Sequence, residues 1–241
     1  MSEIIFAFAA TSTAGVLGFG FLLGLKHATE ADHLVAVSTV VSERRGILKS
    51  ALVGALWGLG HTISLFVAGI AVLLLNFQIS PRVENVLEIC VGIMLALLGM
   101  NVLSKLLGGS KLHVHKHTHG SRFHAHPHIH AVGSSDATET HHGFSFRPRS
   151  VLIGMVHGMA GSAALMLLVI PTIGSRTVGL IYILVFGVGS IAGMALMTFV
   201  VGLPFQFTAL RFIRFNQLLQ GAAGLAGIGL GLWIVCERGL A

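Results

Sequence analysis

The sequence predicts an all-α polytopic membrane protein of about six transmembrane helices, arranged as a 3+3 inverted repeat. Of the 241 residues, 54% are hydrophobic and only 10% are charged, whereas soluble proteins carry about 25% charged residues. So few charged side chains cannot cover a water-facing surface, which excludes an ordinary soluble domain. The 31 glycines are typical of membrane helices, where small residues let backbones approach closely. The third observation is a series of apolar runs, each near the ~20 residues that cross a bilayer.

Six apolar runs are the expected spans. In chain order they are 15–41, 51–75, 84–106, 150–170, 178–202 and 217–236. The apolar sequence begins earlier, at Ile4, which leaves open whether residues 1–14 form an interfacial helix or a seventh span. The start at Met1 lacks the cationic region and small-residue cleavage site of a signal peptide, so we expect it to be retained.

The chain divides into three segments: a first transmembrane half (1–107), a histidine-rich loop (108–149) and a second transmembrane half (150–241). Three matches, in the same order and at a nearly constant offset, relate the two halves. They are Gly24-Leu-Lys-His27 with Gly154-Met-Val-His157, Gly58-Leu-Gly60-His61 with Gly187-Val-Gly189-Ser190, and Gly92 and Gly99 with Gly224 and Gly231. An odd number of spans in each half inverts the second half, and inverted repeats place a substrate site near the bilayer midplane.

Basic residues predict the orientation in the cytoplasmic membrane. Eleven fall in one set of loops, namely Arg44, Arg45, Lys49, Lys105, Lys111, Lys116, Arg122, Arg147, Arg149, Arg211 and Arg214. The alternate loops and the C-terminus hold three, namely Arg82, Arg176 and Arg238. Because short cytoplasmic loops are enriched in Lys and Arg, we expect the first set to be cytoplasmic and, with six spans, both termini to lie outside.

An ionisable cluster lies inside the first span, in Lys26-His27-Ala-Thr-Glu30-Ala-Asp32-His33. Each charged residue costs about 2.5–3.5 kcal/mol at the centre of a span, so such groups must pair, face a wet cavity or bind a cation. Imidazole and carboxylate are ligands of divalent transition metals. In a regular helix Asp32 projects away from Glu30. His27, Glu30, Asp32 and His33 can all converge on one ion only if the helix is broken or tightened here. Otherwise Asp32 holds the imidazole of a ligand on a neighbouring helix.

Two further histidines fall inside predicted spans. His61 lies in the second span between Gly60 and Thr62, and His157 lies in the fourth. Intramembrane ionisable residues are expected to be functional, although a histidine such as His157 could also simply hydrogen-bond a neighbouring helix. The candidate metal ligands are therefore His27, Glu30, Asp32, His33, His61 and His157.

Ten of the fourteen histidines lie in the loop. They are His113, His115, His117, His119, His124, His126, His128, His130, His141 and His142. This segment has too little apolar sequence to pack, so we expect disorder. Alternating histidines offer several weak, exchangeable accessory sites for Ni²⁺, Co²⁺, Cu²⁺ or Zn²⁺. Whether the loop is essential or a dispensable buffer stays open.

The pattern H-x4-D-H from His27 to His33, followed by Leu59-Gly60-His61-Thr62, resembles the signatures of the nickel/cobalt transporter (NiCoT) family over about residues 15–75. The resemblance implies that His27, Asp32, His33 and His61 line the selectivity site of a permease for Ni²⁺ or Co²⁺. The family's later acidic motifs are not found. Instead, the segment that begins Gly154-Met-Val-His157 resembles the urease-accessory, UreH-type branch of nickel permeases.

The resemblance implies uptake of metal for maturation of a metalloenzyme such as urease or hydrogenase, with a cytoplasmic nickel chaperone or urease accessory protein as a partner. The short chain and its histidine-rich loop also resemble nickel/cobalt efflux relatives, so the direction stays open. No P-loop motif is present, and we expect neither an enzyme activity, nor a prosthetic group, nor nucleic-acid binding.

Two other classes are alternatives. A transmembrane thiol carrier of the DsbD type needs cysteines that correspond across the repeat, and Cys90 and Cys236 do not. A membrane metal sensor or store would need only one anchoring span, not six spans with a buried ionic cluster.

Overall fold

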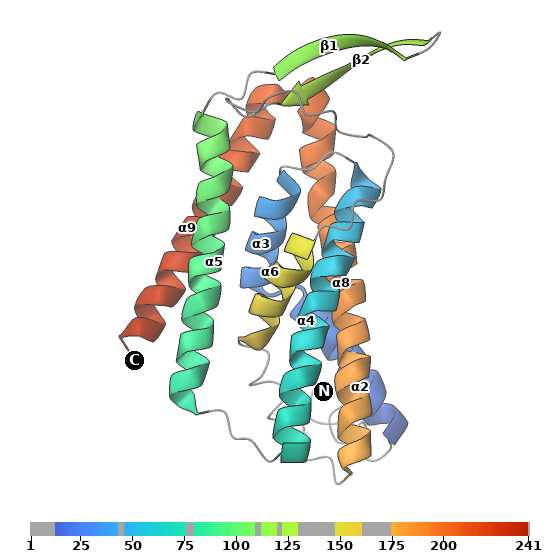
Figure 1. Cartoon of the computed structure of the whole chain (residues 1–241), viewed down its shortest axis with the longest axis vertical. Helices are drawn as coiled ribbons and strands as arrows, with labels where there is room; N and C mark the ends of the chain where they lie inside the picture. Colours follow the sequence, from blue (N-terminus) through green and yellow to red (C-terminus); the bar gives the residue numbers. More distant parts are fainter. Residues whose placement is uncertain are drawn as a thin grey trace, which may run out of the picture.

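The computed structural model describes residues 13–42, 46–75, 80–108, 112–119, 122–129, 148–160 and 175–240. These residues form a helical bundle with a two-stranded hairpin at one end (Figure 1). The helices are α2 (Thr13–His27), α3 (Ala31–Ser42), α4 (Ile47–Leu75), α5 (Pro81–Leu107), α6 (Pro148–Met159), α8 (Arg176–Arg211) and α9 (Ile213–Gly239). The predicted all-α membrane fold is confirmed for the bundle.

Four of the described helices are long and apolar enough to cross a membrane, namely α4, α5, α8 and α9. They contain the predicted spans 51–75, 84–106, 178–202 and 217–236. The first predicted span, 15–41, is occupied by two short helices, α2 and α3, so the helix is broken, which is one of the two alternatives that the sequence left open. The fourth predicted span, 150–170, begins as α6, and residues beyond Ala160 lie outside the described part up to Ser175.

The interruption between α2 and α3 is a tight turn. The backbone N–H of Thr29 donates to the carbonyl of Lys26 at 2.8 Å, and that of Glu30 donates to the carbonyl of His27 at 3.1 Å. These bonds span three residues rather than four, so they close a 3₁₀-type turn that ends α2. The Thr29 hydroxyl also donates to the Lys26 carbonyl, at 2.6 Å. Figure 1 shows α2 ending and α3 beginning inside the bundle.

The bundle is built from paired helices. Helix α4 packs along α8 and α5 along α9, while α2 lies against α8 and α6 against α4. Helix α3 lies inside, in contact with α5, α8 and α9. The main apolar core surrounds α3 and includes Ala36, Val37, Trp57 and Met194.

The paired contacts follow the predicted repeat. A Cβ at Gly24 on α2 would collide with the carbonyl oxygen of Phe186 on α8, and a Cβ at Gly154 on α6 would collide with that of Trp57 on α4. Each glycine and each partner therefore has its counterpart in the other half of the chain. The same exchange relates Gly189 against Phe21 to Gly60 against Val151, and Gly92 against Gly231 to Gly99 against Gly224.

Corresponding helices run in opposite directions. In Figure 1, α4 runs away from the hairpin end and α8 runs back toward it, while α5 runs toward that end and α9 away from it. The shorter helices α2 and α6 are also opposed. The second half is therefore an inverted copy of the first in its described helices, which agrees with the predicted inverted repeat.

Two stretches of the histidine-rich loop, for which disorder is expected, pair as strands. Strands β1 (Leu112–His119) and β2 (Arg122–Ile129) form an antiparallel pair, in which His113 is the register partner of His128 and His117 that of His124. Because His-x-His alternation has the two-residue period of a strand, the sequence pattern is compatible with pairing. His130, His141 and His142 lie outside the described residues.

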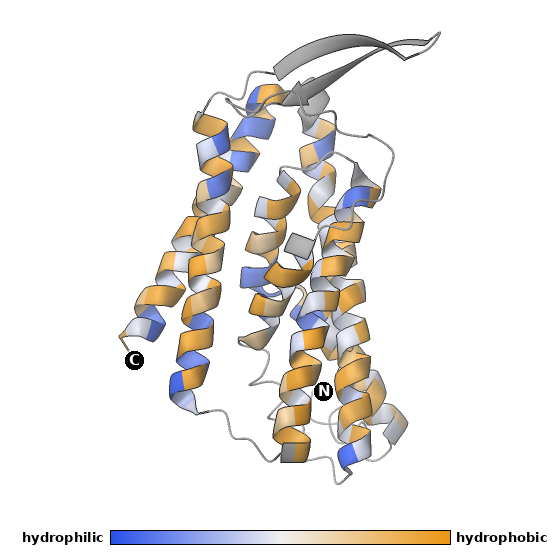
Figure 2. Ribbon diagram, viewed as in Figure 1, coloured by the Kyte–Doolittle hydropathy of each residue, from blue (hydrophilic) through white to orange (hydrophobic). Residues whose placement is uncertain are grey.

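The outer surface of the bundle is apolar. Exposed side chains include Val67 of α4 (62%), Leu97 of α5 (57%), Val188 of α8 (57%) and Leu225 of α9 (62%). Figure 2 shows hydrophobic residues along the middle of the long helices and more hydrophilic ones toward their ends. An exposed apolar belt of this kind fits a lipid environment rather than water.

The close glycine contacts give a test of the helix pairing. We expect Gly24→Ala and Gly231→Ala to lower the free energy of unfolding by about 1–3 kcal/mol, because the added methyl groups meet backbone atoms that cannot yield. A Cβ at Gly231 would lie 2.7 Å from the backbone nitrogen of Ala96. Thermal unfolding of purified protein in detergent measures the effect.

Matched controls lie on the same two helices. A Cβ at Gly18 of α2 or Gly229 of α9 meets no atom of the described residues within 4 Å. Gly18→Ala and Gly229→Ala should leave the melting temperature unchanged or raise it slightly, since alanine favours helix. Equal losses in all four variants would contradict the packing assigned to the repeat.

Candidate metal-binding site

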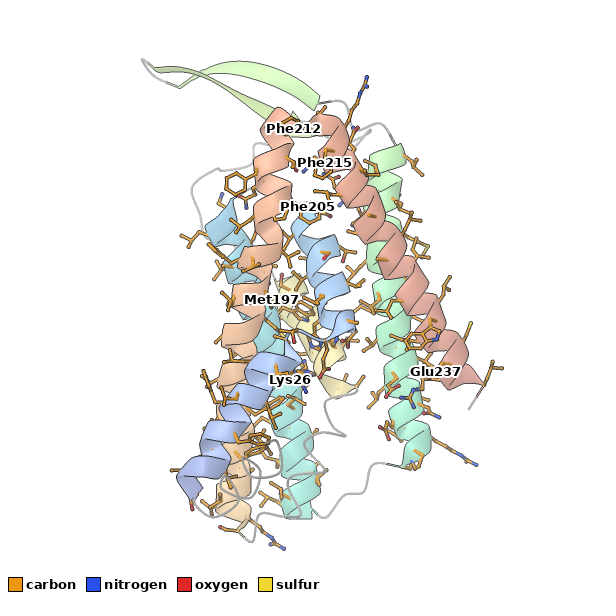
Figure 3. All side chains as sticks on the ribbon, turned by 180° about the vertical axis from the view of Figure 1, so that it is seen from behind. Lys26, Met197, Phe205, Phe212, Phe215 and Glu237 are labelled. Carbon is orange, nitrogen blue, oxygen red and sulfur yellow. The ribbon has the colours of Figure 1, made fainter. Side chains whose placement is uncertain are left out.

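Four histidines meet where the short helices end inside the bundle. His27 is the last residue of α2, His33 lies in the first turn of α3, His61 lies midway along α4, and His157 lies near the end of α6. Their exposed fractions are only 3%, 1%, 0% and 2%. Figure 3 places Lys26, the residue before His27, at about mid-height of the bundle. The predicted histidines therefore come together, although they belong to both halves of the sequence.

The helix interruption is what allows His27 and His33 to meet. In a continuous α-helix, six residues separate two positions by about 9 Å along the axis. Here the ring centroids of His27 and His33 are 4.4 Å apart. The turn from Ala28 to Glu30 is the break in the helix that lets the His27 and His33 side chains come together.

His27, His33 and His61 form one group of potential ligands. One ring nitrogen from each lies within 4.8 Å of the other two. Because a metal ion binds imidazole at about 2.0–2.1 Å, an ion held by all three rings would bring these nitrogens within about 4.2 Å of one another. Three imidazoles with converging nitrogens suit late first-row divalent ions, including Co²⁺, Ni²⁺, Cu²⁺ and Zn²⁺.

Most ring nitrogens of this group have no hydrogen-bond partner in the described part of the protein. Nε2 of His27, Nε2 of His33 and both ring nitrogens of His61 are buried without a hydrogen-bond partner among the described residues. Leaving a buried polar atom unpaired costs about 1–3 kcal/mol, and each such atom in a protein needs an explanation. A bound cation would satisfy several of them at once.

Asp32 joins two of the rings. One carboxylate oxygen lies 3.1 Å from Nδ1 of His33, and the other lies 2.8 Å from Nε2 of His157. The first oxygen also accepts the backbone N–H of His33, at 2.9 Å. A carboxylate on the far nitrogen of a ligating histidine fixes its tautomer and orientation. Asp32, His33 and His157 also form a second group of potential ligands.

Glu30 has a similar position beside His27. A carboxylate oxygen of Glu30 lies 3.0 Å from Nδ1 of His27, without the geometry of a hydrogen bond. Its side chain is 40% exposed, and that of Asp32 is 31% exposed. Both carboxylates thus lie at the more open side of a histidine cluster that is itself fully buried.

Two aromatic residues that the sequence did not single out form walls of the site. Trp57 stacks on His33 with centroids 5.6 Å apart and also contacts His157 at 5.4 Å, while Phe186 contacts His27 at 5.7 Å. Trp57 and Phe186 occupy equivalent positions in the repeat. Each lies one helical turn before a member of the repeated motifs, His61 and Ser190 respectively, and this spacing is the signal that would have identified them.

One relative decides the family. The urease accessory protein UreH of Bacillus sp. (strain TB-90) is 38% identical over 205 residues, which are 85% of this chain and 84% of that protein. The chain belongs to the UreH family. The resemblance of the Gly154–His157 segment to UreH-type proteins is thereby confirmed.

More distant relatives are two chloroplast proteins of Arabidopsis thaliana, FOR GROWTH AND FERTILITY 1 and 2. They are 28% and 27% identical over 237 and 221 residues, or 95% and 91% of this chain. The aligned regions are 62% and 55% of those two proteins, so the similarity covers only part of each. No protein-family model and no solved structure matches the chain.

The arrangement of Asp32 predicts how a substitution acts on metal binding. We expect Asp32→Asn to weaken Co²⁺ or Ni²⁺ binding about 10–100-fold, because an amide removes the negative charge that orients His33. Binding to the purified protein at buffered free metal, with Co²⁺ absorption as a second signal, measures the loss.

Ser38→Ala is the control for that measurement. Ser38 lies on the same helix, and its hydroxyl donates to the carbonyl of Leu34 at 2.7 Å, away from the histidines. Loss of the Ser38 hydroxyl should leave the affinity for Co²⁺ or Ni²⁺ unchanged. Wild-type affinity in Asp32→Asn would show that this carboxylate neither binds nor orients the ligands.

Proposed function

We propose that this protein is a secondary transporter, a permease that moves Ni²⁺ or Co²⁺ through the cytoplasmic membrane. The observation that carries the proposal is the convergence of His27, His33 and His61 at a helix break in the interior of an apolar bundle. Buried ionisable groups at mid-height of a membrane protein are costly and mark ion pathways. A purely structural cluster would pair its nitrogens internally, whereas five of the six ring nitrogens of these histidines have no hydrogen-bond partner among the described residues.

The location of the cluster supports a transport mechanism. His27, His33 and His61 belong to the first half of the chain, and His157 and Phe186 to the second, so the site lies between the two inverted repeats. Transporters built from inverted repeats bind substrate at discontinuous helices near the midplane and expose it alternately to the two sides. The break between α2 and α3 is such a discontinuity.

The charge of the site suits a cation. A dehydrated divalent ion in a low-dielectric interior needs compensating negative charge, and Asp32 and Glu30 provide two carboxylates beside the histidines. Histidine nitrogen is also a softer ligand than the oxygens that Mg²⁺ and Ca²⁺ prefer. The donor set therefore favours transition metals over the abundant alkaline-earth ions.

The orientation follows from the basic residues. Helices α4 and α9 begin, and α5 and α8 end, at the hairpin end of the bundle in Figure 1, and the basic loops of the sequence belong to that end. We assign it to the cytoplasm by the excess of Lys and Arg. The histidine-rich loop would then lie in the cytoplasm, where it could exchange metal with a nickel chaperone or a urease accessory protein.

Uptake is the direction we propose. The similar protein from Bacillus is named as a urease accessory protein, and a permease that supplies nickel for metalloenzyme maturation fits that name. Efflux by the same site is the second candidate, because the histidine-rich loop suits collection of metal for export equally well.

The other classes find less support. Cys90 and Cys236 are both exposed and not joined by a disulfide, and neither borders the buried site, as a thiol carrier would require. A membrane sensor or store would have no use for an inverted repeat around a buried cluster. A variant lacking both cysteines should therefore transport metal normally.

Substitution of the ligands tests the proposed transport. In cells or proteoliposomes, His27→Ala and His33→Ala should reduce ⁶³Ni movement to background. Each variant leaves only two of the three imidazoles that would replace the water ligands of the ion inside the bundle. Membrane insertion, measured by the amount of protein in the membrane fraction, should match wild type. Ser38→Ala should transport normally.

The wild type decides the direction in the same assay. Higher cellular nickel on expression means uptake, and lower nickel with increased metal resistance means efflux. Normal ⁶³Ni accumulation in His27→Ala would contradict the site, and no dependence of cellular nickel on the wild-type protein would contradict transport itself.

Deletion of Lys111–His142 separates the loop from the transport step. We expect the maximal transport rate to be retained, because the buried ligands lie in the helices. Transport at low metal concentration should fall, if the loop concentrates the ion. Complete loss in a well-inserted deletion variant would place the essential site in the loop.

A further inference from the structure

The two groups of ligands share one residue. His27, His33 and His61 form the first group, and Asp32, His33 and His157 form the second. The ring of His33 is close to both histidines that correspond in the repeat: its centroid is 4.4 Å from that of His27 and 4.1 Å from that of His157. By contrast, His61 is closer to His27 (5.0 Å) than to His157 (6.2 Å).

The two ring nitrogens of His33 have different surroundings. Its Nδ1 lies 3.1 Å from Asp32, on the side of the second group. Its Nε2 is buried without a hydrogen-bond partner among the described residues and is left for the first group. A neutral imidazole has one lone pair available for a metal, because its other nitrogen carries the proton. The two groups can therefore not both bind an ion through His33 at the same time.

The two groups also differ in exposure. All three members of the first group are buried, at 3% exposure or less. The second group contains the side chain of Asp32, which is 31% exposed. In the second group Asp32 pairs with His157 at 2.8 Å, whereas in the first group both ring nitrogens of His27 and of His61, and Nε2 of His33, have no hydrogen-bond partner among the described residues. The second group is thus the more accessible, and the first is enclosed.

We propose that the site has two overlapping metal positions, and that an ion passes between them by exchanging ligands around His33. Asp32, His33 and His157 form the accessible position, and His27, His33 and His61 form the enclosed one. Only one position is occupied at a time. This inference rests on the proposed transport function and adds a step to it: His157 acts in transfer of the ion, while His61 acts in its retention.

The experiment compares equilibrium binding with the rate of movement in the full-length protein. Binding of ⁶³Ni is measured in detergent at buffered free Ni²⁺, and the initial rate of ⁶³Ni movement is measured in proteoliposomes. The histidine-rich loop contributes the same background to every variant. We expect His61→Ala to weaken tight binding at least about tenfold, with loss of transport.

We expect His157→Ala to keep the affinity within about threefold of wild type, while the initial rate falls at least about tenfold. His157→Asn, which keeps a polar side chain at the position, should show the same separation and guards against a folding defect. His33→Ala should lose both binding and movement, and Ser38→Ala should lose neither.

Two results would overturn the inference. Equal losses of affinity in His61→Ala and His157→Ala would indicate a single site of four histidines, and an unchanged rate in both His157 variants would indicate a structural histidine. In either case transport by the wild type would stand. Failure of the wild type to bind and move ⁶³Ni would instead contradict the proposed function.

Discussion

The interior of this protein depends on one constraint, the need to compensate polar groups placed where water is absent. The turn at Ala28–Glu30 breaks a helix inside the bundle, and the histidines around it are 0–3% exposed. An interrupted backbone and unpaired imidazoles both cost free energy in an apolar medium. The hydrogen bonds of the short turn replace helical hydrogen bonds that are lost at the break. The unpaired ring nitrogens of His27, His33 and His61 are left for a cation. The same break brings His27 and His33 within contact.

The inverted repeat holds this site in place. Glycines at corresponding positions let α2 lie on α8, and α6 on α4, at backbone contact. The ends of α2 and α6 thereby bring both His27 and His157 against the ring of His33. Trp57 and Phe186, which correspond in the same way, form the aromatic walls. The repeat is incomplete where it matters chemically, because His61 has Ser190 as its counterpart. A nearly symmetric scaffold therefore carries an asymmetric set of ligands.

Much of the architecture could be predicted from residues alone. The low charge and the long apolar runs predict the membrane fold, and the repeated Gly24–His27 and Gly154–His157 segments predict the inverted relation that the helix pairs display. The first span could be predicted as one apolar run, but a break within it could only be left open, because its only sequence signal is the polar cluster itself. For the histidine-rich loop, composition argues against packing, whereas the two-residue period of its histidines is compatible with the pairing of β1 with β2.

The sequence by itself determined which chemical groups are available: imidazoles and carboxylates in a chain too apolar to leave them in water, and an H-x4-D-H pattern shared with metal permeases. Only the tertiary structure decided how those groups combine. The pairing of Asp32 with His157, the shared position of His33 and the walls of Trp57 and Phe186 join residues from the two halves of the chain. Local pattern cannot specify such contacts, because they arise from the way two antiparallel copies of one motif pack across the bundle.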